Sequence, residues 1–123
     1  MEQMKVLLVD DEEELVSTLA KRLQFRGIEA QYVTSGEKAM ERLKNHNFDL
    51  LVVDLKMPGL NGIEFMRKVK EFNSKIKFIF VTGHSTQNDA EKSLQGGASD
   101  FLLKPVSINV LIEKMHLALK NKG

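Results

Sequence analysis

The sequence predicts an α/β domain whose five strands form one parallel sheet covered by helices on both faces. Short runs rich in Val and Leu alternate with stripes of apolar residues at helical spacing, and this alternation is typical of parallel strands joined by crossover helices. The runs are almost wholly apolar, as strands buried on both faces of a parallel sheet must be. A chain of 123 residues is long enough for one compact core and too short for two. We therefore expect a single domain over residues 1–123.

Two strand–helix units make up the first part of the chain. Residues 6–9 form the first strand, and the stripe that follows ends before Gly27, a residue type that favours helix termination. This stripe consists of Leu15, Val16, Leu19, Ala20 and Leu23. Residues 28–34 form the second strand, and Ser35 caps a helix. The apolar side of that helix carries Ala39, Met40 and Leu43.

Three further units follow. Residues 50–55 form the third strand, and residues 56–62, with one proline and two glycines, form a tight loop before the next helix. Residues 77–81 form the fourth strand, and Ser85 caps a weakly anchored helix. Its only apolar positions are Ala90 and Leu94. Residues 101–103 form a short fifth strand, and Ser107 caps the last helix. The strongest apolar stripe in the chain lies on this helix, at Ile108, Leu111, Ile112, Met115, Ala118 and Leu119.

Composition excludes several classes of function. Eighteen basic and seventeen acidic residues leave a formal charge of +1, so there is no electrostatic footprint for nucleic acid or an anionic membrane. The chain has no cysteine, which excludes disulfides and thiolate metal sites. We find no signal peptide and no apolar run long enough to span a bilayer. We expect a cytoplasmic protein that binds neither nucleic acid nor membrane directly.

Acidic side chains follow two of the buried strands. Asp10 and Asp11 end the first strand, and Asp54 stands at the end of the third. We adopt the strand order 2-1-3-4-5 of flavodoxin-like folds, in which the first and third strands are neighbours where the order of strands reverses. Ligands of open α/β sheets bind at this point. Three carboxylates gathered there repel one another unless a divalent cation or protons neutralise them.

The strand ends together resemble a known family, the receiver domains of bacterial two-component response regulators. The resemblance covers essentially the whole chain and is nearest in detail to receivers of the nitrogen-regulator type. Its residues are Asp10 and Asp11, Asp54 followed by Met57-Pro58-Gly59 and Gly62, Thr82 after the fourth strand, and Lys104-Pro105 after the fifth. No one of these is specific, but their placement at the ends of successive strands is.

The resemblance implies a phosphorylation site. Asp54 would accept a phosphoryl group from a sensor histidine kinase or phosphotransfer protein. Mg²⁺ would be held by Asp11, Asp54 and the backbone carbonyl of Lys56, with Asp10 contributing through a water molecule. Lys104 and Thr82 would neutralise the equatorial phosphoryl oxygens, which is most of what this chemistry asks of a protein. The protein would assist its own phosphotransfer and dephosphorylation without being an enzyme in the usual sense.

The resemblance also implies a switch. Thr82 and Phe101 match the residues that move when the family is phosphorylated, and Phe101 stands where many members have tyrosine. Lys56 and His84 would tune the lifetime of the phosphorylated state. The face formed by the fourth helix, fifth strand and fifth helix would bind an output domain, a partner protein or a second copy of the chain.

Two other functions are alternatives. A pseudo-receiver would be a binding module that never takes phosphate, although such proteins usually lack an acidic or lysine position that this chain has. A phosphatase of the haloacid-dehalogenase type would need a second aspartate two residues after its nucleophile, whereas Asp10 is followed by Asp11 and Glu12. A flavodoxin-like carrier is disfavoured because the acidic edge would repel the flavin phosphate.

Overall fold

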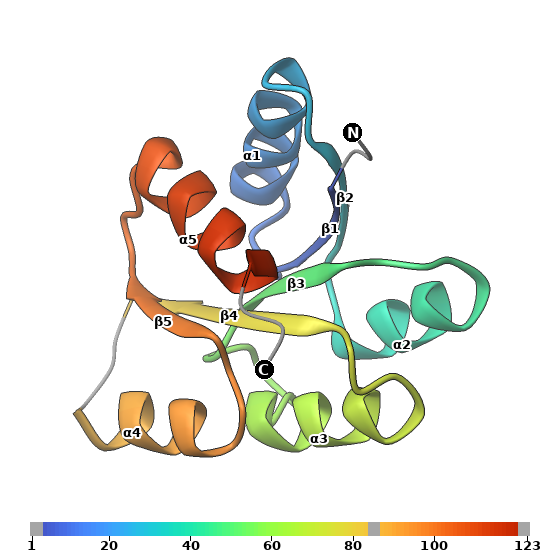
Figure 1. Ribbon diagram of the computed structural model, residues 1–123, viewed down its shortest axis with the longest axis vertical. Coiled ribbons are helices and arrows are strands. Elements are labelled where there is room, and N and C mark those ends of the chain that lie inside the picture. The colour runs from blue at the N-terminus through green and yellow to red at the C-terminus, as the bar shows by residue number, and fades with distance from the viewer. Residues whose placement is uncertain (1–3, 84–86, 121–123) are drawn as a thin grey trace.

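The computed structural model describes residues 4–83 and 87–120, in which five strands alternate with five helices (Figure 1). The strands are β1 (Lys5–Val9), β2 (Glu29–Val33), β3 (Leu50–Asp54), β4 (Lys77–Thr82) and β5 (Asp100–Leu103). The helices are α1 (Glu13–Phe25), α2 (Gly36–Asn45), α3 (Gly62–Phe72), α4 (Gln87–Gln95) and α5 (Ile108–Lys120). All strand pairs are parallel, in the order β2-β1-β3-β4-β5. The predicted fold and strand order are confirmed.

Helices cover both faces of the sheet, α1 and α5 on one side and α2, α3 and α4 on the other (Figure 1). Successive strand residues point to opposite faces, so the same strands feed two separate cores. On the side of α1 and α5, Leu8 and Val52 pack with Leu23 and Met115. This two-sided burial explains why the strands are almost wholly apolar.

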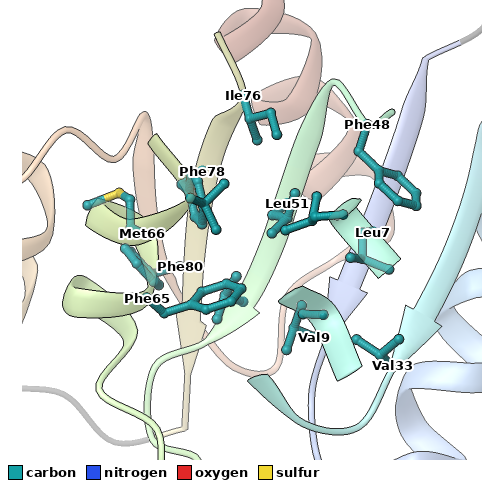
Figure 2. Packing of buried hydrophobic residues seen from close by; sticks show 14 of the residues in the cluster. Leu7, Val9, Val33, Phe48, Leu51, Phe65, Met66, Ile76, Phe78 and Phe80 are labelled. Atoms are coloured by element: carbon teal, nitrogen blue, oxygen red, sulfur yellow. The ribbon is translucent and has the colours of Figure 1, made fainter. Parts of the chain in front are cut away.

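The second core lies under α2 and α3 and is rich in aromatic side chains (Figure 2). Phe78 is fully buried, and its ring meets that of Phe65 edge to face, with centroids 6.1 Å apart. The ring of Phe80 also lies 6.1 Å from that of Phe78, in a tilted arrangement. Edge-to-face pairs add about 0.5–1.5 kcal/mol to the burial of the rings. Phe78 is therefore the centre of this core.

Side chains at helix starts fix where α2 and α3 begin. The hydroxyl of Ser35 accepts a hydrogen bond from the Lys38 N–H at 3.2 Å, as expected for a cap. Asn61 was expected only as part of the loop over residues 56–62, yet its side chain caps α3 by accepting from the Glu64 N–H at 3.1 Å. Ser107 precedes α5, but its contact with the Val110 N–H is long, at 3.5 Å. Ser85, expected to cap α4, lies outside the described residues.

Two leucines of the expected helical stripes are exposed. Leu15 of α1 is 51% exposed, because the buried side of this helix consists of Val16, Ala20 and Leu23. Leu94 of α4 is 48% exposed, and the side chain that α4 buries fully is Ser93. The expectation that α4 is weakly anchored agrees with this packing.

The register of the sheet brings the strand ends together. Val9 pairs with Val53, Asp54 with Val81, and Thr82 with Leu103. Asp10 therefore follows β1 beside the end of β3. Within residues 4–83 and 87–120, no helix is both long and apolar enough to cross a membrane.

The aromatic core makes a direct prediction for stability. We expect Phe78→Ala to lower the free energy of unfolding by about 3–5 kcal/mol, because it removes a fully buried ring and leaves a cavity. Phe25→Ala is the matched control, since Phe25 is 90% exposed, and should change it by less than about 0.5 kcal/mol. Urea denaturation followed by circular dichroism measures both. Equal effects would contradict the assignment of the core.

Candidate functional site

Polar side chains are buried at the carboxyl ends of three neighbouring strands. Asp10 after β1 is 7% exposed, Asp54 at the end of β3 is 6% exposed, and Thr82 at the end of β4 is fully buried. Apolar strands anchored on both faces hold these ends in place. The arrangement confirms that the sheet brings Asp10, Asp54 and Thr82 to one edge.

A single lysine joins the carboxylates. The Nζ of Lys104, which follows β5, lies 2.8 Å from Asp10 Oδ2, 3.2 Å from Glu12 Oε1 and 3.3 Å from Asp54 Oδ2. Burial by itself lowers the pKa of Lys104, but the hydrogen bond to Asp10 and the charges of Asp10 and Asp54 outweigh it and raise this pKa overall. The ammonium therefore stays charged wherever the protein is folded near neutral pH.

Asp10 and Asp54 are held in the same way. The Oδ1 atom of Asp10 accepts from the backbone N–H of Glu12 at 3.0 Å, and that of Asp54 accepts from the N–H of Lys56 at 3.0 Å. In each carboxylate, one oxygen accepts a hydrogen bond from the turn that follows its strand, and the other contacts Lys104. Both side chains are fixed before any ligand arrives, which is the kind of preorganisation that charge-stabilising sites need.

The cluster has the composition of a site for a hard divalent cation. Among the described residues, carboxylate oxygens of Asp10, Glu12 and Asp54 lie within 4.8 Å of one another. Oxygen donors of this kind suit Mg²⁺, which keeps several waters and takes one or two carboxylates. The oxygen donors of this cluster fit the expected Mg²⁺ ion.

Glu12 is the third carboxylate that lies with Asp10 and Asp54. Asp11 is exposed and lines a neighbouring cleft with Thr34 and Met57, whereas Glu12 contacts Lys104. Glu12 immediately precedes α1, which begins at Glu13. The contact joins residues 92 positions apart, so no local signal could have shown it.

Two other predicted residues, Phe101 and Lys56, have contacts of their own. Phe101 is partly buried and packs against the core under α2 and α3. The Lys56 side chain forms an ion pair with Asp89 of α4 at 3.2 Å. The Lys104–Pro105 peptide is cis. His84 lies outside the described residues.

Comparison with known proteins gives a consistent assignment. The family model of the response regulator receiver domain matches residues 6–116. The chain is 33% identical over 118 residues to the sensory transduction protein RegX3 of Mycobacterium tuberculosis H37Rv, covering 96% of this chain and 52% of that protein. Several curated relatives are longer, and the chain spans about half of their length or less.

Solved structures agree with this match. A CheY-like response regulator receiver domain from Methanospirillum hungatei JF-1 superposes with a TM-score of 0.89 at 28% identity, covering 97% of this chain and 95% of that one. The beryllofluoride-activated NtrC4 receiver domain dimer gives a TM-score of 0.89 at 30% identity, with 97% and 98% covered.

The ammonium at the strand ends makes a testable prediction. We expect Lys104→Met to lower the free energy of unfolding by about 1–3 kcal/mol in metal-free buffer, because buried carboxylates lose their partner. The folded-state pKa of Lys104 is raised, so this difference should persist from neutral pH to roughly pH 10, the ordinary lysine pKa. It should then disappear as pH rises through the folded-state pKa. Denaturation at several pH values measures it.

Lys114→Met is the matched control. Lys114 pairs with Asp100 at 3.5 Å, and both side chains are about one third exposed, so the variant should lose less than about 1 kcal/mol. Millimolar Mg²⁺ should recover part of the loss in Lys104→Met and none in Lys114→Met. Equal losses in the two variants would show that Lys104 does not neutralise the cluster.

Proposed function

The chain belongs to the response regulator receiver domain family, and from this premise we propose that it is a signalling switch that accepts a phosphoryl group on Asp54. The observation that carries this proposal is the environment of Asp54. Its carboxylate is buried at a strand end, fixed by the Lys56 N–H and contacted by the Lys104 ammonium. A carboxylate held in this way is a competent nucleophile for phosphorus.

The phosphoryl group would come from a phosphohistidine of a sensor kinase or phosphotransfer protein. The phosphorus–nitrogen bond breaks, a phosphorus–oxygen bond to Asp54 forms, and the donor imidazole leaves with the electron pair. Lys104 already contacts Asp10 and Asp54, so it can follow the charge that develops on the phosphoryl oxygens. Transfer of this kind depends mainly on positioning and on neutralising that charge. Later hydrolysis of the acyl phosphate resets the switch.

Mg²⁺ would supply further positive charge at the phosphoryl oxygens when bound. We propose the ligand set implied by the family: Asp11, Asp54 and the backbone carbonyl of Lys56, with Asp10 acting through a water. The acidic cluster of Asp10, Glu12 and Asp54 supports a cation at this edge. Glu12 then serves as a partner of Lys104 instead of a direct ligand.

Phosphorylation would be read out on the face formed by α4, β5 and α5. Thr82 is buried beneath the site and Phe101 is partly buried on β5, so both can respond to a new charge at Asp54. The face carries exposed apolar side chains at Leu94, Leu103, Val110 and Leu117. An output domain, a partner protein or a second copy of the chain would cover them. The last is supported by the NtrC4 receiver, which was solved as an activated dimer.

The proposed function predicts a covalent modification. Incubation with Mg²⁺ and acetyl phosphate should add the mass of one phosphoryl group, and hydroxylamine should remove it because it cleaves acyl phosphates. The gain should be absent in Asp54→Ala and present in Asp49→Ala, a matched aspartate exposed at the opposite end of β3. Intact-protein mass spectrometry measures this. A folded protein that gains no mass would favour a pseudo-receiver.

The proposed metal ligands predict different effects at two adjacent positions. Asp11→Asn should weaken Mg²⁺ binding by about tenfold or more, as loss of an essential part of a metal site does. Glu12→Gln removes only a largely exposed charge and should weaken it by less than about fivefold. Isothermal titration calorimetry compares the two. A larger loss of Mg²⁺ affinity in Glu12→Gln than in Asp11→Asn would show that Glu12, and not Asp11, is the metal ligand.

A further inference from the structure

An ion pair connects the phosphoacceptor loop to α4. The Nζ of Lys56 lies 3.2 Å from Asp89 Oδ2, with side chains 51% and 24% exposed. Lys56 is two residues after Asp54, and its backbone N–H donates to the Asp54 carboxylate. Asp89 is the third residue of α4. The same lysine therefore contacts the proposed phosphorylation site through its backbone and α4 through its side chain.

α4 is held mainly by polar contacts. Its one fully buried side chain, Ser93, bonds back to the Asp89 carbonyl of the same helix at 2.9 Å. At the other end, Lys70 of α3 donates to the carbonyl of Gly97, just after α4, at 3.2 Å. Lysines from outside the helix thus contact it near each end. Contacts of this kind exchange partners more readily than buried apolar surface does, because each is worth about 1 kcal/mol or less at an exposed position.

We propose that Asp89 is a positioning residue that holds the Lys56 ammonium on α4 in the resting protein and yields it to the phosphoryl group once Asp54 is modified. The proposal rests on the phosphorylation of Asp54. A phosphoryl group brings about −1.5 to −2 charges and three acceptor oxygens, more than the single carboxylate of Asp89 offers. The flexible four-carbon stem of lysine suits such an exchange. Phosphorylation of Asp54 then removes an ion pair from the first turn of α4.

A simpler role for Asp89 must be separated from this one. A carboxylate in the first turn of a helix is favoured by the helix dipole whatever its partners, so loss of Asp89 alone could loosen α4. The two roles differ in their dependence on Lys56. A dipole effect is the same with or without Lys56, whereas positioning requires it.

The test is a double-mutant cycle of Lys56 and Asp89, in which the rates of phosphorylation and dephosphorylation are measured. Asp89→Asn should speed phosphorylation by acetyl phosphate, at saturating Mg²⁺, by about two- to fivefold, because the freed ammonium attracts the anionic donor. It should lengthen the lifetime of the phosphorylated protein by a similar factor. In a Lys56→Met background, which keeps the backbone carbonyl, Asp89→Asn should change neither rate. Asp89→Glu, which can restore the pair, should return both towards wild type.

Glu91→Gln is the matched control for charge. Glu91 lies on the same helix and contacts Gln87 at 3.3 Å, so its removal changes the net charge equally and should leave both rates within about 1.5-fold of wild type, on the scale of exposed charges. Equal effects of Asp89→Asn with and without Lys56, or no effect in either background, would overturn the positioning role.

Hydrogen exchange separates failure of this inference from failure of the proposed function. Asp89→Asn should speed amide exchange in α4 of the unphosphorylated protein, and Lys56→Met should do the same, because each breaks the pair. If the wild type takes no phosphoryl group, both the proposed function and the transfer of Lys56 from Asp89 to the phosphoryl group are wrong. Hydrogen exchange then still tests whether the Lys56–Asp89 pair stabilises α4. Unchanged exchange in both variants, with normal phosphorylation, would overturn the inference alone.

Discussion

The functional edge of this protein depends on one ammonium that contacts three carboxylates at the end of the sheet. Lys104 contacts Asp10, Glu12 and Asp54 at 2.8–3.3 Å, and without a cation there the carboxylates would repel one another. The carboxylate oxygens lie within 4.8 Å of one another, and two unit charges at about this separation interact by about 3–4 kcal/mol for an effective dielectric constant of 20. That repulsion is of the order of the whole stability of a small domain. Lys104 therefore offsets part of this repulsion, and the proposed phosphoryl group would bring more negative charge than this one ammonium can balance.

The sheet can hold these carboxylates close together because apolar packing anchors its strands on both faces. Phe78 and Phe80 pack towards α3, and the alternate residues Ile79 and Val81 pack towards α5. With the strands fixed, their polar ends have no freedom to move apart. The turns after β1 and β3 then bind one oxygen of Asp10 and of Asp54 through backbone N–H groups. The reactive edge is thus a consequence of apolar packing that lies elsewhere.

The fold and most of the site could be predicted from the sequence, because apolar runs and strand-end motifs are local signals. Asp10, Asp54, Thr82 and Lys104 are placed by the ends of strands, and the sheet brings these ends together. Other features depend on side-chain direction or on contacts between distant residues. The pairing of Glu12 with Lys104 and the exposure of Leu15 depend on where α1 begins and how it is rotated. The Lys56–Asp89 pair depends on where α4 lies against the loop after β3.

The unequal anchoring of the helices decides which of them can carry a signal. α1, α2, α3 and α5 each bury two or more apolar side chains, and each buried Val, Leu, Ile, Phe or Met side chain contributes about 1.5–3 kcal/mol. The charge and hydrogen bonds of one phosphoryl group could not displace helices held in this way. α4 fully buries only a serine and is held by lysine contacts near each end. Those contacts are similar in strength to the ones a phosphoryl group can offer, and this is why we propose α4 as the helix that phosphorylation of Asp54 would move.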